Sequence, residues 1–420
     1  MKLYFFIRPI VRFGLKLYFK NIFVSGLNKI QFNKSIILAS NHPSAFFEPI
    51  LMACLHKRTF YFLTRGDIFQ KSFFNSLLSK LNMIPIFRFR DGHENMKKNQ
   101  EVFNLCNKLL TNKEAIMIFP EGHLSSGIGL DKLQKGTARM AFNALQNDAN
   151  MDLWIVPITF YYSDQTNFRG DAFAECNKPI HVNDYFKDYI EHDALTINVL
   201  TQDLEKVLDE KVIKIEHNQY KTMLQSILKM YRNEFEINRN KAIIENRSIY
   251  QNSRLICNNF IGLDDHKKDY LLEKFNKLEN LVSKSDYNIL FPVSQISTAK
   301  YYFALITGII PYMIGYINLF PINIAKAFTE KKVIDPAFVG PVKFGTSLFF
   351  WIIYYCILLI LALIINNVIL YFYVILLPFI TYYAIYYYDF IKFERNSRKS
   401  NPEINKLRNE FMAEIDELIR

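Results

Sequence analysis

The sequence predicts an α/β fold, a twisted and largely parallel sheet flanked by helices, followed by a helical region and C-terminal membrane helices. Three observations support this prediction. Short apolar runs alternate with helical patterns over the first half of the chain. A charged, amphipathic region without strand patterns follows at about residues 194–297. Long, nearly uncharged apolar stretches come after that region.

The N-terminal segment is basic and aromatic, and the first acidic residue of the chain is Glu48. Arg8, Arg12 and Lys16 lie among Phe, Tyr, Leu and Ile residues. Such a segment is typical of a helix in the membrane interface, and we assign residues 1–30 to it. A buried helix with snorkelling lysines is the alternative. Because these charges interrupt any continuous apolar core, we do not expect a cleaved signal peptide.

Residues 31–193 are assigned to the α/β domain. Apolar runs predict six strands, at residues 35–40, 59–63, 84–89, 115–119, 154–161 and 179–182. Two segments between strands, 94–110 and 132–145, carry apolar residues at spacings of three and four, as crossover helices do. Strands that alternate with helices favour a parallel sheet covered on both faces.

Residues 194–297 are assigned to a helical connector, and residues 298–391 to membrane-embedded helices. Three apolar stretches, at 301–320, 344–365 and 368–388, are each close to the roughly 20 residues that cross a bilayer. Only Asn366-Asn367 separates the last two, which predicts a helical hairpin. The first stretch contains Gly308 and Pro311 and is expected to be kinked or re-entrant. Buried soluble helices are the alternative reading.

The C-terminal tail, residues 392–420, begins with a basic cluster and predicts the topology. Lys392, Arg395, Arg398 and Lys399 follow the last apolar stretch, and such clusters remain on the cytoplasmic side. We therefore expect an integral protein on the cytoplasmic face of the cell membrane, with two full spans. The formal net charge of +11 suits anionic lipids, and its aromatic setting at the N-terminus does not favour nucleic acid. The five cysteines show neither paired nor metal-binding spacing.

A histidine and a carboxylate follow the first predicted strand of the α/β domain. In one continuous helix, His42 and Glu48 would point about 120° apart and could not meet. A turn at Pro43-Ser44 would place His42 in a loop and Glu48 near a helix start. The carboxylate could then orient the imidazole, leaving its second nitrogen to take a proton from an attacking hydroxyl. This arrangement requires no serine or cysteine nucleophile.

Four further blocks follow the Asn-His block in a fixed order. They are Thr-Arg-Gly-Asp-Ile-Phe at 64–69, Ile-Pro-Ile-Phe-Arg-Phe-Arg-Asp-Gly at 84–92, Ile-Phe-Pro-Glu-Gly at 118–122 and Val-Pro-Ile at 156–158. Together they resemble the acyltransferase family that includes bacterial glycerol-3-phosphate and lysophosphatidate acyltransferases. The resemblance covers roughly residues 30–185. Its specificity comes from the shared order of independent blocks.

The resemblance implies roles for individual residues. It makes His42 the general base and Glu48 its orienting partner, and Arg88 matches the arginine associated with the acceptor phosphate. Glu121 and Gly122 match the acceptor-binding block.

This sequence departs from the family pattern in two places. The family commonly has Asp with four residues between it and the His, whereas here Glu48 follows His42 with five between. The commoner members place Thr-Arg after Glu-Gly, and this chain has His123-Leu124. A basic phosphate ligand is thereby missing. The nearest substitutes are Lys135 and Arg139, which we expect in substrate binding.

The expected function is O-acyl transfer from acyl-CoA or acyl carrier protein to glycerol-3-phosphate or a lysophospholipid. The expected partners are membrane lipid and the acyl donor, no metal or redox cofactor is implied, and the pattern assigns no oligomeric state. Phe46, Phe47, Phe73 and Phe74 could line a slot for the acyl chain, although aromatic residues at such positions are more often core. The alternatives are a non-phosphate lipid acceptor and an inactive membrane adaptor, the latter supported by the altered His-to-acid spacing.

Overall fold

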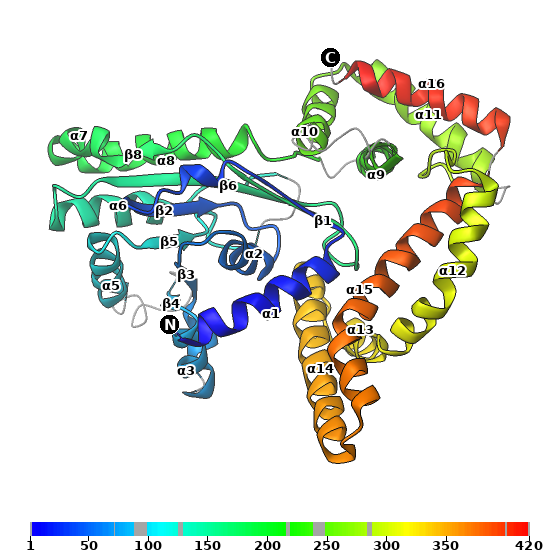
Figure 1. The fold of residues 1–420 in the computed structure, drawn as a ribbon. Coiled ribbons are helices and arrows are strands. Elements are labelled where there is room, and N and C mark those ends of the chain that lie inside the picture. The colour runs from blue at the N-terminus through cyan, green and yellow to red at the C-terminus, as the bar shows by residue number, and fades with distance from the viewer. Residues whose placement is uncertain are drawn as a thin grey trace. The chain divides into compact units, whose positions relative to one another are not determined.

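The computed structural model describes residues 2–70, 72–87, 99–124, 129–215, 219–237, 248–283, 288–399 and 401–418. The chain divides into two compact units. Unit 1 consists of Met1–Val212 together with Asp335–Pro341, and unit 2 of Ile213–Ile334 together with Val342–Arg420. Figure 1 shows the ribbon of both units with most of the helices and strands labelled.

Unit 1 is built on one sheet. Its strands are β1 (Asn21–Ser25), β2 (Ser35–Ser40), β3 (Phe60–Arg65), β4 (Met83–Ile86), β5 (Ala115–Ile118), β6 (Leu153–Tyr162), β7 (Asp171–Cys176) and β8 (Ile180–His181). They follow the order β1-β7-β6-β2-β5-β3-β4, with β8 paired to β6. Only β7 and β8 pair antiparallel to β6, and the other pairings between described strands are parallel. The predicted, largely parallel sheet is confirmed.

Helices cover both faces of this sheet. They are α1 (Lys2–Tyr18), α2 (Phe47–Leu55), α3 (Ser72–Lys80), α5 (Asn99–Thr111), α6 (Gly136–Asn147), α7 (Phe186–Glu191) and α8 (Asp193–Asp209), with short 3₁₀ helices η1 (Leu27–Lys29), η2 (Gly66–Gln70) and η4 (Val182–Tyr185). Ile37 and Ala39 of β2 belong to a buried cluster with α5, α6 and α8. Successive strand residues face opposite sides, so Ile36 and Leu38 point to the other face, where α2 contacts β3 and α1 contacts α2.

Two strands of the sheet, β1 and β7, were not predicted. They pair with each other in parallel at one end of the sheet. All residues of β1 are only half-buried, so its sequence lacks the apolar run that marks the central strands. The predicted strand at 84–89 begins as β4 but ends at Ile86, and residues 88 and 89 lie outside the described part of the chain.

All of the secondary-structure elements that the structure describes in unit 2 are helices. Its helices are α9 (Lys221–Ile237), α10 (Ser248–Ile261), α11 (Asp265–Ser283), α12 (Thr298–Ile317), α13 (Phe320–Lys332), α14 (Pro336–Ile365), α15 (Val368–Ser397) and α16 (Pro402–Glu417), and the first turns of α14 belong to unit 1. The predicted helical region is confirmed. Its helices follow the periodic spacing of Leu, Ile, Tyr and Met residues.

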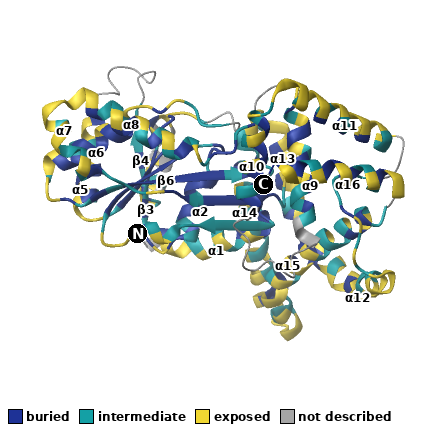
Figure 2. Cartoon of the chain, turned by 90° about the horizontal axis from the view of Figure 1, so that it is seen from above, coloured by how far each residue is buried: buried dark blue, intermediate teal, exposed yellow. Residues whose placement is uncertain are grey.

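Two of these helices, α14 and α15, are long and apolar enough to cross a membrane. Many of their large apolar side chains are exposed. Figure 2 colours the exposed residues of the ribbon yellow. The Asn366-Asn367 turn is formed as the sequence predicts, because Asn366 adopts a φ of 51° and the Asn367 side chain caps α15. The predicted break of the first apolar stretch is a 57° bend between α12 and α13. It lies after Ile317 and not at Pro311.

Small residues let α12 pack closely against α15. A side chain on Gly315 would approach Ala384 Cβ to 2.5 Å, and one on Gly308 would overlap the Tyr387 ring. Close backbone approach at such residues is typical of helices that pack within a membrane. At the end of α12, the Asn318 side chain accepts hydrogen bonds from the Tyr354 and Tyr373 hydroxyls, at 2.7 and 2.8 Å.

Candidate active site

The sheet brings together two sequence blocks that are about 80 residues apart. Strands β2 and β5 are parallel neighbours, with Leu38 opposite Met117 and Ala39 opposite Ile118. His42 lies two residues after β2 and Glu121 three residues after β5. Because the carboxyl ends of parallel strands meet at one edge, both residues fall where open α/β sheets bind their ligands.

His42 and Glu48 are in direct contact. The imidazole Nδ1 lies 3.0 Å from Glu48 Oε2. Residues 43–46 form the bend that the sequence requires, and Glu48 lies in the first turn of α2. The other carboxylate oxygen, Oε1, accepts a hydrogen bond of 3.1 Å from the Ser44 N–H. Glu48 therefore reaches His42 although five residues lie between them, because the chain bends at residues 43–46.

The Glu48 carboxyl group is fully buried. Burial raises its pKa, and the hydrogen bond with His42 opposes this shift. The Tyr162 hydroxyl approaches the same carboxyl group and also favours its charged form, and burial raises the pKa of Tyr162 well above its ordinary value. Within the described residues this hydroxyl completes no hydrogen bond of good geometry. The carboxylate thus depends chiefly on the imidazole and the Ser44 N–H.

The imidazole ring of His42 is held on its flat side as well as at its edge. It stacks on the ring of Phe119, with centroids 3.8 Å apart and an interplanar angle of 16°. Its side chain is 15% exposed, and in the described part of the chain Nε2 makes no hydrogen bond. A neutral ring that donates Nδ1–H to Glu48 leaves Nε2 as the proton acceptor. This geometry is that of a general base with an orienting carboxylate.

Glu121 fastens the histidine loop to the loop after β5. Its Oε1 accepts the His42 N–H at 3.0 Å, and its Oε2 accepts the Asp131 N–H at 3.1 Å. The side chain is 1% exposed, and burial raises its pKa to about 7. Both oxygens are therefore engaged with the backbone. Glu121 thus ties the backbone of the His42 loop to the backbone of the loop after β5.

We predict that Glu121→Gln lowers kcat about tenfold, the effect of one lost hydrogen bond to a charged group. The amide can accept only one of the two N–H groups. Because burial raises the pKa of this carboxyl group to about 7, we expect it to take up a proton as the pH falls through that value, which weakens one of these bonds and should lower the rate. The acid limb of kcat/KM against pH should therefore be less steep in the variant.

Glu101→Gln, at an exposed position of α5, is the control. An unchanged acid limb in Glu121→Gln would contradict this role.

Gly122 closes the turn after β5 in a conformation that favours glycine. Its φ is 75°, and its N–H donates to the Phe119 carbonyl at 3.0 Å. The Pro120 carbonyl accepts the Gln134 N–H at 2.8 Å, which ties the turn to the segment before α6. Gly122 thus shapes the loop that carries Glu121.

The two cations that we expect in substrate binding lie beyond this turn, and so does His123. Lys135 directly precedes α6, Arg139 lies in its first turn, and both are exposed. His123 is engaged at both ring nitrogens, with Nδ1 2.9 Å from the Glu121 carbonyl oxygen and Nε2 3.0 Å from Asp131. These contacts hold His123 against its own loop. Lys135 and Arg139, by contrast, are accessible to a bound headgroup.

Arg88 lies outside the described residues, as do the side chains of Phe73 and Phe74. Phe47 is fully buried among the rings of Tyr18, Phe19 and Tyr162, which makes it a core residue. Phe46 is half-buried and packs edge-on against Phe338.

Three residues at the site were not assigned a role from the sequence. Asn41 uses its side-chain amide to bind both the N–H and the carbonyl of Phe160, at 2.8 and 3.0 Å, and so clamps the end of β2 to β6. Phe119 stacks on the His42 ring, and Tyr162 lies beside Glu48. In the sequence, these residues are marked only by an Asn directly before His42 and by aromatic residues at the ends of strands.

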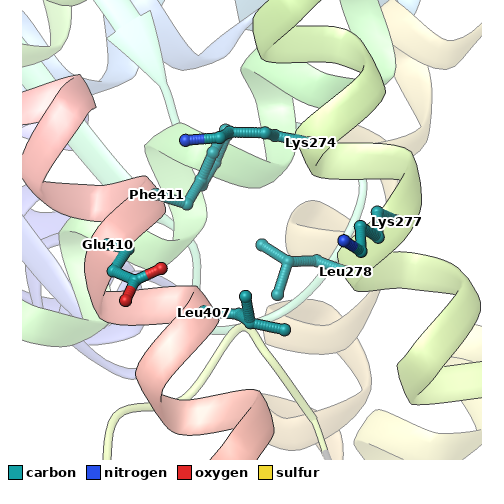
Figure 3. Close-up of a pocket in the computed structure, with 6 residues that line it drawn as sticks. All are labelled: Lys274, Lys277, Leu278, Leu407, Glu410 and Phe411. Carbon is teal, nitrogen blue, oxygen red and sulfur yellow. The ribbon is translucent and has the colours of Figure 1, made fainter.

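The described residues hold no cluster of three or more His, Cys, Asp or Glu side chains that could bind a metal ion. A small cavity of about 70 Å³ lies between α11 and α16 of unit 2 (Figure 3). It is lined by Lys274, Lys277, Leu278, Leu407, Glu410 and Phe411. Pockets for small molecules occupy roughly 300–1,000 Å³, so this cavity is too small for a lipid.

Comparison with known proteins finds a family match and two similar proteins. Residues 21–161 match the family described as Acyltransferase. A glycerol-3-phosphate O-acyltransferase 2 from Saccharomyces cerevisiae (strain ATCC 204508 / S288c) is 25% identical over 263 residues, which are 59% of this chain and 34% of that protein. The chain thus spans about a third of the length of this curated relative. The crystal structure of the 1-acyl-sn-glycerophosphate (LPA) acyltransferase PlsC from Thermotoga maritima matches with a TM-score of 0.34 and 18% identity, covering 48% of this chain and 78% of that one.

Proposed function

Because residues 21–161 form a domain of the acyltransferase family, we propose that this chain is a membrane-bound O-acyltransferase. It moves a fatty acyl group from acyl-CoA or acyl carrier protein to a hydroxyl of glycerol-3-phosphate or a lysophospholipid. The observation that carries this proposal is the 3.0 Å contact between His42 Nδ1 and the fully buried Glu48 carboxylate. A contact of this kind prepares the opposite nitrogen to accept a proton.

The proposed reaction needs no covalent enzyme intermediate. The acceptor hydroxyl oxygen attacks the thioester carbonyl carbon while His42 Nε2 takes the hydroxyl proton. The tetrahedral oxyanion then collapses and breaks the carbon–sulfur bond. The leaving thiolate receives the proton from the imidazolium, which yields the ester and the free thiol. Glu48 stabilises the transient imidazolium by its negative charge.

The membrane part of the proposal has separate support. Helices α14 and α15 are each 30 residues long and sufficiently apolar to span a bilayer. The basic cluster after residue 391 favours the cytoplasmic side for that end of α15. A catalytic domain on the same face would meet both soluble thioester donors and lipid acceptors.

An assay with purified protein tests the function directly. Labelled acyl-CoA and acyl carrier protein are each offered with glycerol-3-phosphate, lysophosphatidate and a neutral monoacyl lipid. Labelled ester with a phosphate-bearing acceptor is the expected product. Transfer only to the neutral lipid would replace the proposed acceptor, and no transfer from either donor would overturn the function.

Arg88→Ala separates phosphate from neutral acceptors. The family resemblance assigns this arginine to the acceptor phosphate, and the loss of a charge-assisted contact raises KM with a smaller effect on kcat. We expect the apparent KM for glycerol-3-phosphate or lysophosphatidate to rise at least tenfold. Lys80→Ala, at an exposed position of α3, is the control for loss of a cation. An unchanged KM in Arg88→Ala would favour a neutral acceptor.

An inactive membrane adaptor is the less favoured function. Its main support was the altered spacing between the histidine and its acid. That support is removed, since Glu48 reaches His42 at hydrogen-bond distance across five intervening residues.

A further inference from the structure

The first residues of α14 lie against the catalytic loop. Asp335–Pro341 is part of unit 1, although it is far in sequence from the rest of that unit. The Ala45 N–H donates a hydrogen bond of 3.2 Å to the Ala337 carbonyl. The Phe46 ring packs edge-on against Phe338, with centroids 5.9 Å apart. Both contacts fall on the bend between His42 and Glu48.

Gly340 allows this close approach. A Cβ atom at this position would lie 1.9 Å from the Gln165 carbonyl oxygen and 3.0 Å from the Phe47 ring. The first distance is far below any real contact and involves backbone, so it cannot be relieved by a side-chain rotation. Phe47 directly precedes Glu48 in α2. A shift of the first turn of α14 would therefore act on the part of α2 that carries the Glu48 carboxylate.

The loop needs this support because its own hydrogen bonds are few. Residues 43–46 form no helix or strand. Ser44 N–H is bound by Glu48, and Ala45 is buried, so its N–H requires an acceptor to avoid the cost of a buried unpaired donor. The Ala337 carbonyl supplies that acceptor. This carbonyl is available because the residue four positions further along α14 is Pro341, which has no N–H to donate to it.

The same helix then becomes strongly apolar. No charged residue occurs from Phe344 to the end of α14 at Ile365. The uncharged stretch begins one helical turn after Gly340. Residues 335–341 also lie outside the segment that matches the acyltransferase family. A part of the chain beyond the family domain thus contacts the loop of the proposed base.

We propose that Asp335–Pro341 is a positioning element for His42 and Glu48, which aligns the base through the bend that joins them. This inference rests on the proposed function. The first turns of a membrane-type helix set the geometry of the reaction, and they do so without touching the reacting atoms.

The test compares two Gly→Ala substitutions in one helix. In Gly340→Ala the new Cβ forces α14 away from Gln165, whereas a Cβ at Gly345 meets nothing within 4 Å. A displacement of about 1 Å at a catalytic group costs up to about a hundredfold in rate. We expect Gly340→Ala to lower kcat tenfold to a hundredfold with little change in KM, and Gly345→Ala to stay within about twofold of the unsubstituted chain. Phe338→Leu, which removes the ring contact without the backbone clash, should give a smaller fall of the same kind.

Hydrogen exchange supplies a readout that does not depend on activity. Amides of residues 44–47 should exchange faster in Gly340→Ala and Phe338→Leu, and at the original rate in Gly345→Ala. Unchanged exchange and unchanged kcat in the first two variants would overturn the inference. If the unsubstituted protein transfers no acyl group at all, the proposed function fails, while the exchange data still decide whether this helix start holds the loop.

Discussion

Replacing His42 with alanine is expected to lower kcat for acyl transfer by about 10²–10⁴-fold, the usual contribution of a positioned general base. The acceptor hydroxyl would then have to lose its proton to water. The remaining loop contacts do not involve the imidazole, since Glu121 binds the His42 backbone N–H and Ser44 binds Glu48 through its own N–H. The measurement is the initial rate of labelled ester formation at saturating donor and acceptor.

The control is His266→Ala, at an exposed position of α11. It should keep its full rate. Resistance to extraction by alkaline carbonate should stay close to that of the unsubstituted protein in both variants. The thermal unfolding midpoint should fall in His42→Ala, because the fully buried Glu48 carboxylate loses its imidazole partner, and stay unchanged in His266→Ala. Undiminished turnover in His42→Ala would remove the proposed mechanism.

Much of the sheet could be predicted from the sequence. The central strands are buried on both faces, so Ser35–Ser40 and Ala115–Ile118 read as short apolar runs between helical patterns. The strand β1 escaped prediction because it is half-buried and lies in a basic, aromatic segment. Its partner β7 begins with Asp171, which is buried but polar, and this breaks the apolar pattern.

The candidate site was predictable where contacts are local and less so where they are distant. A bend at Pro43 follows from proline geometry, and the contact between His42 and Glu48 required it. The contact of Ala45 with Ala337 joins residues almost 300 positions apart through a backbone carbonyl. No side-chain pattern encodes such a bond. The hydrogen bond that the His42 N–H donates to Glu121 could not be predicted for the same reason, since its donor is a backbone group.

Glu48→Gln is expected to lower kcat about a hundredfold or more while leaving the loop folded. The amide oxygen can still accept a hydrogen bond from Nδ1, so the ring keeps a partner of the same size. The negative charge that stabilises the imidazolium is lost, and the base becomes weaker. The acid limb of kcat/KM against pH should therefore move to lower pH. The measurement is the full pH profile of both proteins.

The thermal stability of Glu48→Gln distinguishes an electrostatic role of Glu48 from a role in packing. In the unsubstituted chain burial raises the pKa of Glu48, which means that the buried charge is held at a cost in desolvation. Removing the charge should leave the thermal midpoint equal or slightly higher, whereas the rate falls. Glu48→Asp makes the complementary change. It keeps the negative charge but shortens the side chain, which draws the carboxylate back by about one bond length, roughly 1.5 Å, from the 3.0 Å contact with His42. A rate that falls in Glu48→Asp but not in Glu48→Gln would show that the side chain acts through shape alone and would refute its electrostatic role.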